Sequence, residues 1–247
     1  MPYDSRMNAS SRGRRVAFFG GSFDPPHLGH LAVARAARTA LDLDTVLFAP
    51  VGAQPLKPQG ATASFEHRLA MTGLAIAGDA GFELSLADAP KASGAPNYTL
   101  ETLLTLRAEL PAGGALFCLM GADSFMALRH WRRAPEIPFA APLVVASRPG
   151  QLLNNLRDAL PAGLTIEAVP DQGLGAGEAE LCRWDLKNRA GEKTPFYLLP
   201  GLNVDVSASE IRAQVRAGMG SQAARHELLP QAVSEYIRTH HLYLDGI

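Results

Sequence analysis

The residues best suited to chemistry lie in the run Gly20–His30, which reads GGSFDPPHLGH between an apolar stretch and a helical pattern. Gly20 and Gly21 lack Cβ atoms, so a phosphate can approach their backbone closely. The N–H groups at the start of the following helix carry partial positive charge and form an anion site. His27 and His30 are three residues apart, which places both imidazoles on one face of the first helical turn. The run therefore predicts a polyphosphate site.

Two other interpretations of the same run stay open. In the first, it is only a tight strand-to-helix turn with incidental histidines. In the second, Asp24, His27 and His30 form a metal triad; the residue types are acceptable, but no Cys or further His cluster stands nearby. Binding of phosphate and of the transition state uses every feature of the run, and we favour it.

A second run with chemical potential is Val206–Arg212, VSASEIR. Ser207 is a good helix N-cap, and Glu210 three residues later completes a capping box. Arg212 falls in the first turns of that helix, where the helix dipole disfavours a cation. An arginine at this end indicates an anionic partner.

Gly121 and Asp123 follow the apolar run 115–120. A glycine and then a carboxylate at a strand end suit close backbone approach and a hydrogen bond to a ribose hydroxyl. An Asp that only caps a helix is the alternative on local evidence.

These runs need a scaffold, and apolar runs that alternate with helical patterns supply one. The predicted strands span residues 15–20, 45–49, 115–120, 142–146 and 196–199, and the predicted helices span 28–41, a segment from Ser64, and 99–110. This alternation predicts an α/β fold: a Rossmann-like, doubly wound, mainly parallel sheet with helices on both faces and a C-terminal helical segment. Ligands of such sheets bind beyond the carboxyl ends of the strands. The segment Gly173–Thr194 shows no clear period and is interpreted as a surface excursion.

Composition restricts the class of protein. The 247 residues carry 23 Lys and Arg against 24 Asp and Glu, a net charge of −1 that argues against general nucleic-acid binding. Cys118 and Cys182 are too few for a disulfide framework. No stretch approaches the roughly 20 apolar residues of a membrane helix, and residues 1–14 lack the apolar centre of a signal peptide. We expect a cytoplasmic protein with a flexible tail, 1–14, and one domain, 15–247.

Several motifs together carry a resemblance to a known family. The run Gly20–His30 closely resembles the GxFDPxHxGH signature of the HxGH nucleotidyltransferase superfamily, and within it the bacterial nicotinate-nucleotide adenylyltransferases. Residues 206–212 resemble the family's ISxTxIR segment, with Ser209 where Thr is commoner, and 121–124 resemble GxDS. Residues 96–99 resemble P-x-YT, and 147–150 (SRPG) also match. Residues 54–58 stand where the family has PPHK, with Lys57 kept and Leu56 replacing the His. The resemblance runs from about Val16 to about Tyr243.

The resemblance implies an enzyme that joins nicotinate mononucleotide to the AMP part of ATP, giving deamido-NAD and pyrophosphate in NAD biosynthesis. It implies that Mg²⁺ arrives on the ATP phosphates and that no metal is held by a protein cage. The residues implied for catalysis are His27, His30, Arg212 and Lys57. Those implied for ATP binding also include Gly20, Gly21, Ser22, Phe23, Gly121, Asp123, Arg148, Ser207, Ser209 and Ile211. Those implied for the acceptor nucleotide are Asn97, Tyr98, Thr99 and Trp131.

Two rivals stay open. One is another HxGH adenylyltransferase, with nicotinamide mononucleotide or phosphopantetheine as acceptor. The other is a non-catalytic nucleotide-binding module. Trp131 and Thr99 favour a pyridine nucleotide by the resemblance, because an aromatic platform suits a flat cationic ring.

Overall fold

The structure is a computed structural model and describes residues 13–55, 60–147, 156–168, 181–199, 206–217 and 228–244. Through them runs one eight-stranded sheet in the order β3-β2-β1-β4-β5-β8-β7-β6. Its strands are β1 Arg15–Gly21, β2 Thr45–Pro50, β3 Phe82–Leu84, β4 Ala115–Gly121, β5 Leu143–Ala146, β6 Thr165–Ala168, β7 Cys182–Lys187 and β8 Lys193–Leu199. The five pairings from β3 to β8 are parallel, and the two at the β6 edge are antiparallel. The predicted fold class is confirmed.

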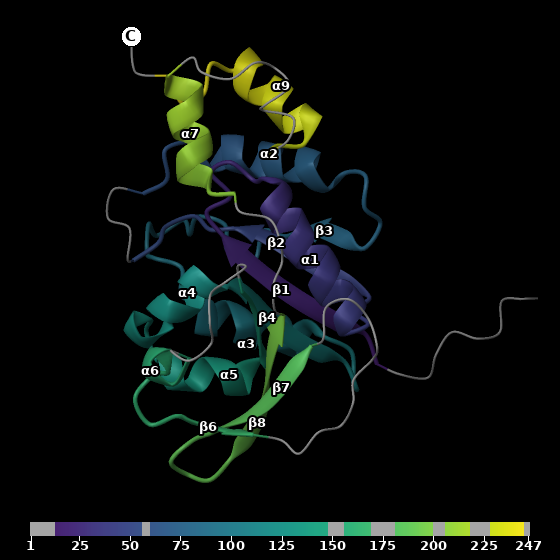
Figure 1. Cartoon of the computed structure of the whole chain (residues 1–247), viewed down its shortest axis with the longest axis vertical. Helices are drawn as coiled ribbons and strands as arrows, with labels where there is room; N and C mark the ends of the chain where they lie inside the picture. Colours follow the sequence, from purple (N-terminus) through teal and green to yellow (C-terminus); the bar gives the residue numbers. More distant parts are fainter. Residues whose placement is uncertain are drawn as a thin grey trace, which may run out of the picture.

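Helices cover both faces of this sheet (Figure 1). They are α1 Leu28–Ala40, α2 Phe65–Ile76, α3 Thr99–Glu109, α4 Ala122–Ala127, α5 Ile137–Ala140, α6 Leu156–Ala159, α7 Ala208–Arg216 and α9 Gln231–Thr239, with short 3₁₀ turns at Leu128–His130 and Ala134–Glu136. Successive residues of β1 point to opposite faces. Val16 and Phe18 join the core under α3 and α5, whereas Ala17 and Phe19 join the core under α1. The central strands are therefore apolar on both sides, as parallel strands require.

A third apolar cluster lies at one end of the molecule. It joins α2, α7 and α9 through residues such as Met71, Ile211 and Val233. Figure 1 shows these three helices together at the top, away from β6 and β7. The predicted C-terminal helical segment is thus present in the part of the chain that the structure describes, and it packs on α2.

The strand order places the site. β1 lies between β2 and β4, and the chain fills one side of β1 with β2 and β3 before it returns to β4 on the other side. Doubly wound sheets bind ligands at such a reversal, so the site is expected at the carboxyl ends of β1 and β4. Phe19 of β1 pairs with Leu119 of β4, so Gly21 and Gly121, two residues further along each strand, end at the same level.

One prediction about the sheet is wrong. The segment Gly173–Thr194 is not only a surface excursion, because β7 lies inside it and pairs antiparallel with β8. Along β7, Cys182, Trp184 and Leu186 pack against the core, and the residues between them are charged. Alternating apolar and charged residues are typical of a strand. The strand was not predicted because the surrounding segment is rich in Gly and charged residues. Residues 173–180 of the segment lie outside the described residues.

The predicted N-terminal tail, 1–14, lies mostly outside the described residues as well. Arg14, at its end, bonds to the sheet: its Nη2 donates to Thr45 Oγ1 at 3.1 Å and to Glu83 Oε1 at 2.9 Å. The packed part of the chain therefore includes Arg14. The single domain over 15–247 stays a prediction.

Candidate active site

The two histidines lie against each other at the start of α1. His27 is the N-cap residue, and its backbone N–H donates to His30 Nδ1 at 3.1 Å. The ring centroids are 3.7 Å apart with 31° between the planes. The prediction that both imidazoles share one face is confirmed. The local reason is the helix itself, since the third residue after an N-cap faces back toward it.

The environment of His30 keeps its ring uncharged near neutral pH. Its half-buried ring lies against Phe23, with centroids 5.0 Å apart, and Phe19, at 6.0 Å. Burial, and then the neighbouring His27, lower the pKa of His30 well below its ordinary value. Because Nδ1 accepts the His27 N–H, a neutral ring carries its proton on Nε2. His30 can therefore offer one N–H donor to an oxyanion without bringing a charge.

In the glycine turn before α1, side chains pack inside the protein and backbone groups can face a ligand. A Cβ on Gly20 would lie 2.7 Å from the Phe18 ring, so this position needs glycine for packing. Phe23 has a φ of 47° and a buried side chain, so only its backbone is available to a nucleotide. Ser22 Oγ lies 3.2 Å from Gln54 Oε1, which ties this turn to the loop after β2.

Arg212 reaches the same turn from α7. Its Nη1 donates to the Asp24 carbonyl oxygen at 2.7 Å, and its Nη2 lies 3.3 Å from Ser209 Oγ. Its Nε is buried and has no hydrogen-bond partner among the described residues. The predicted Ser207 cap is present, with Ser207 Oγ accepting from the Glu210 N–H at 3.1 Å, but among the described residues the Glu210 side chain does not bond back to complete the predicted capping box. Two segments 188 residues apart thus meet at one point.

Ile211 and Asp24 have structural roles. Ile211, predicted to bind ATP, is buried in the cluster of α2, α7 and α9, so its side chain positions α7. The Asp24 carboxylate accepts from the N–H groups of Thr62 (2.6 Å) and Ala63 (3.1 Å) and from the Tyr243 hydroxyl (2.8 Å). The metal-triad interpretation gains no support, because the described residues hold no group of three His, Cys, Asp or Glu side chains suited to a metal.

Arg68 is a buried arginine whose guanidinium bonds to the backbone of the scaffold. It is 2% exposed, and its three nitrogens donate to the carbonyl oxygens of Ala63 (3.2 Å), Ser22 (2.7 Å) and Val51 (2.8 Å). Burial lowers the pKa of Arg68, and the charge of Asp24 opposes this effect. Arg68 therefore joins the loops after β1 and β2 and the segment before α2. Composition alone predicts Arg on the surface, and only the fold reveals this role.

On the neighbouring strand, Gly121 is the N-cap of α4 and Asp123 is an exposed residue of its first turn. A Cβ placed on Gly121 would meet no atom within 4 Å, so this glycine faces open space. Gly21 and Gly121 therefore lie side by side at the carboxyl ends of β1 and β4, and their role in nucleotide binding stays a prediction.

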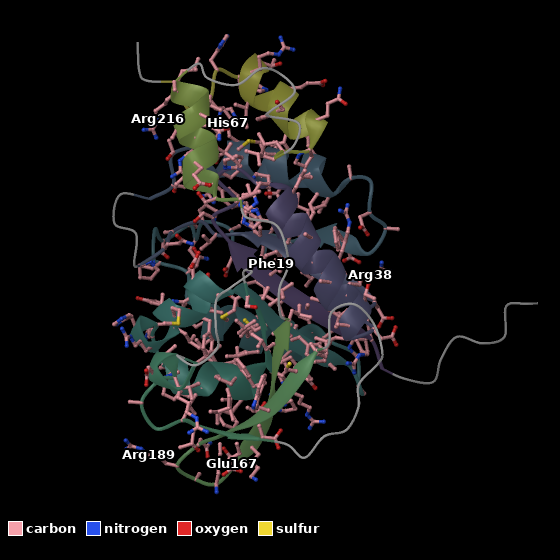
Figure 2. All side chains as sticks on the ribbon, in the orientation of Figure 1. Phe19, Arg38, His67, Glu167, Arg189 and Arg216 are labelled. Carbon is pink, nitrogen blue, oxygen red and sulfur yellow. The ribbon has the colours of Figure 1, made fainter. Side chains whose placement is uncertain are left out.

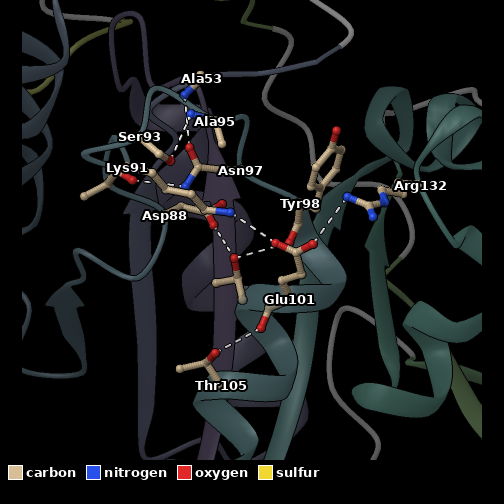
Figure 3. A network of polar contacts seen from close by, with 12 residues as sticks. Ala53, Asp88, Lys91, Ser93, Ala95, Asn97, Tyr98, Glu101, Thr105 and Arg132 are labelled. Atoms are coloured by element: carbon tan, nitrogen blue, oxygen red, sulfur yellow. Dashed lines mark hydrogen bonds and ion pairs between the residues drawn. The ribbon is translucent and has the colours of Figure 1, made fainter.

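Two of the residues predicted for the acceptor, Asn97 and Tyr98, lie at the start of α3 (Figure 3). Asn97 is buried; its Oδ1 accepts from the Ala53 N–H at 3.1 Å, and its Nδ2 donates to the Ala89 carbonyl oxygen at 3.0 Å. The side chain of Asn97 thus holds two loops together. Tyr98 is the N-cap of α3 and Thr99 its first residue, and both are half-buried.

Arg132 connects this helix start to the loop of Trp131. Its guanidinium lies 4.5 Å from the Tyr98 ring centroid, and its Nη1 lies 3.5 Å from Glu101 Oε1. Glu101 also pairs with Lys91 at 3.1 Å. Trp131 is half-buried beside the core under α3. Sequence reasoning missed Arg132 and Glu101, although Arg132 stands directly after Trp131.

Asp88 is a second buried group that the motifs did not reveal. It hydrogen-bonds the Thr102 hydroxyl, and one of its oxygens would lie 3.6 Å from a Cβ on Gly20. Burial raises the pKa of Asp88, and burial followed by the charge of Asp88 raises the pKa of Cys118 to about 12. Cys118 is therefore an inert thiol, as expected from its apolar strand.

Comparison with known proteins agrees with this geometry. A family model described as cytidylyltransferase-like matches residues 18–214. Proteins named "Probable nicotinate-nucleotide adenylyltransferase" from Gloeobacter violaceus and Geobacter sp. (strain M21) are 36% and 34% identical to this chain. The matches cover 94% of this chain and 97% and 99% of those proteins. The chain belongs to this family of nucleotidyltransferases.

Solved structures support the fold. Plasmodium falciparum nicotinic acid mononucleotide adenylyltransferase, in complexes with NaAD and with APC, superposes with TM-scores of 0.65 and 0.64 at 14% identity. Each alignment covers 93% of this chain and 97% of that one. The predicted family and enzyme class are thus confirmed. Lys57 and Arg148 lie outside the described residues, and the individual site residues stay predictions.

Proposed function

We propose that this chain transfers the AMP part of ATP to nicotinate mononucleotide, giving deamido-NAD and pyrophosphate, at the carboxyl ends of β1 and β4. The observation that carries the assignment of the site is the 2.7 Å hydrogen bond from Arg212 to the Asp24 carbonyl oxygen. It brings the cation of α7 to the turn that bears His27 and His30. Groups suited to one polyphosphate therefore converge from two distant segments.

The reaction needs no enzyme nucleophile. A phosphate oxygen of nicotinate mononucleotide attacks the α-phosphorus of ATP in line, a new P–O bond forms, and the bond from the α-phosphorus to the bridging oxygen breaks. The electron pair leaves with pyrophosphate. Catalysis comes from alignment of the two substrates and from stabilisation of charge on the phosphate oxygens.

His27 and His30 bind oxygens of the α-phosphate and of the leaving group. The Nε2 proton of a neutral His30 suits this role, because it donates without needing desolvation of a charge. Arg212 supplies the positive charge, and Lys57 assists from the loop after β2. Mg²⁺ enters as part of the ATP substrate, bound to its phosphates.

We place the ribose of ATP and the pyridine ring of the acceptor along the carboxyl ends of the strands. Gly20, Gly21 and Gly121 leave backbone open to ATP, and Asp123 accepts from its ribose. The pyridine ring lies toward Trp131, with the N-terminal amides of α3 at Tyr98 and Thr99 receiving the nicotinate carboxylate. Asn97 contributes by holding this helix start to Ala53 and Ala89.

The chain works in the cytoplasm under this proposal, where its substrates are available. None of the helices described has the length and apolar character needed to cross a membrane. We propose no nucleic-acid partner, because the net charge is only −1.

One assay separates the proposed function from its rivals. Pyrophosphate release is measured with ATP and, in parallel, nicotinate mononucleotide, nicotinamide mononucleotide or phosphopantetheine. We expect release with the first acceptor at the highest kcat/KM. Faster release with another acceptor would assign the chain to that reaction, and ATP binding without release from any acceptor would indicate a non-catalytic module.

A further inference from the structure

Asp24 joins four segments of the chain at the active-site turn. Its carboxylate accepts from Thr62, Ala63 and Tyr243, and its carbonyl oxygen accepts from Arg212. The residue is 4% exposed. The position of Asp24 is therefore determined by the segment before α2, by α7 and by the end of the described chain together.

The position of Asp24 determines the positions of the two histidines. Only Pro25 and Pro26 separate it from His27. Proline rings fix φ, so these two residues leave His27 few ways to move independently of Asp24. His27 in turn holds His30 through the bond to Nδ1. A displacement of Asp24 would therefore displace both imidazoles relative to Arg212.

Tyr243 is held in an unusual conformation while it makes this contact. Its φ is 65°, in the left-handed region that non-glycine residues rarely adopt. Its side chain is 6% exposed, and its hydroxyl donates to Asp24 Oδ1 at 2.8 Å. Burial, and then Asp24, raise the pKa of the phenol, so it stays a donor at every physiological pH. Strained backbone persists where the surrounding structure demands it.

A second contact ties the same C-terminal segment to the catalytic turn. The backbone N–H of Leu28, the first residue of α1, donates to the Leu228 carbonyl oxygen at 2.9 Å. The segment 228–244 thus holds the turn on both sides of the two prolines, through Leu228 and through Tyr243.

We infer that Tyr243 is a positioning residue for adenylyl transfer, acting through Asp24 to hold the two imidazoles in line with Arg212. This inference rests on the proposed function. Tyr243 touches no substrate in this scheme; it lowers the barrier by limiting how far the donors can drift from the phosphate oxygens.

The test compares two hydroxyl deletions on the same segment. Tyr243→Phe removes the bond to Asp24. Tyr236→Phe, on α9, removes a hydroxyl that lies 3.1 Å from His67 Nδ1 (His67 is labelled in Figure 2) and has no contact with the turn. We expect kcat per ATP-binding molecule to fall about tenfold or more in Tyr243→Phe, with both KM values within about twofold. Tyr236→Phe should keep the wild-type kcat.

A spectroscopic measurement distinguishes positioning from simple loss of stability. The His30 ring lies against His27, Phe19 and Phe23. When the turn loosens, water reaches the ring, and its NMR titration midpoint should rise toward the ordinary 6.5. We expect that shift in Tyr243→Phe and not in Tyr236→Phe. An unchanged midpoint together with an unchanged kcat in Tyr243→Phe would overturn the inference.

Two further results keep the test decisive. If Tyr243→Phe cannot be purified, Asp24→Asn replaces it: one side of the amide is an NH2 group, so it cannot accept from Thr62, Ala63 and Tyr243 together as the carboxylate does. We expect kcat to fall in Asp24→Asn, and a wild-type kcat there would show that the position of Asp24 does not set the rate and would overturn the inference. Wild-type protein is assayed first, since a wild type that makes no deamido-NAD refutes the proposed function, whereas an active wild type with an equally active Tyr243→Phe refutes only the positioning role.

Discussion

Replacing His30 by Asn tests the chemistry assigned to the imidazole pair. His30 has two functions in the structure: Nδ1 accepts the His27 N–H at 3.1 Å, and Nε2 offers a proton to the substrate. The amide oxygen of Asn stands near the place of Nδ1, but its NH₂ group does not reach the place of Nε2. His30→Asn therefore removes the catalytic donor and keeps the local acceptor, whereas His30→Ala removes both.

The magnitudes follow from these contacts. One preorganised donor to a developing oxyanion contributes about 2.7 kcal/mol, so His30→Asn should lower kcat about 10²-fold. Its free energy of unfolding should exceed that of His30→Ala by about 1 kcal/mol, because Ala leaves the His27 N–H without its acceptor. Both variants lose the ring contacts with Phe19 and Phe23, so the difference between them isolates the hydrogen bond.

The assay is steady-state pyrophosphate release with ATP and nicotinate mononucleotide, combined with urea unfolding. Equal losses of activity in both variants, with His30→Ala less stable than His30→Asn, would agree with the assignment. A turnover in His30→Asn within about threefold of wild type would refute the role of Nε2, since a lost donor of this kind lowers the rate far more.

Three further predictions follow from the same site. Burial depresses the pKa of His30, so the stability contributed by the neutral ring is complete above the ordinary 6.5 and is lost as pH falls below it. In thermal melts, the unfolding midpoint of wild type should therefore decrease in acid, and the midpoint of His30→Asn should depend less on pH. In Gly121→Ala no atom lies near the new Cβ, so the variant should melt like wild type but raise the KM for ATP several-fold. Gly20→Ala, whose new Cβ meets the Phe18 ring, should instead lose about 1–3 kcal/mol of stability. A normal KM for ATP in Gly121→Ala would place the nucleotide elsewhere. Asn97→Ala leaves the part-buried N–H of Ala53 and carbonyl of Ala89 without their side-chain partner and should cost about 1–3 kcal/mol in urea unfolding, and an undiminished stability would show that water replaces both bonds.

Residues close in sequence determined much of this protein. The alternation of apolar runs with helical patterns predicted the parallel sheet. Four predicted strands appear within one residue of their expected ends, and the fifth, β8, begins three residues earlier than predicted. The caps at Ser64 and Ser207 form as their local sequence indicates. The stacking of His27 on His30 is likewise a property of one helical turn. Such features depend on contacts within a few residues, where spacing alone sets the geometry.

Only the tertiary structure decided which polar groups serve the ligand and which hold the scaffold. Arg212 and Asn97 were both predicted as ligand groups, yet Asn97 is bonded to a backbone amide and a carbonyl of distant loops. Arg68, which was not predicted for the site, is likewise bonded to backbone carbonyls. The contact of Tyr243 with Asp24 spans 219 residues and leaves no pattern in the sequence. The physical reason is that a buried polar group must find its partner in whichever segment the fold brings near, and spacing along the chain does not encode that choice.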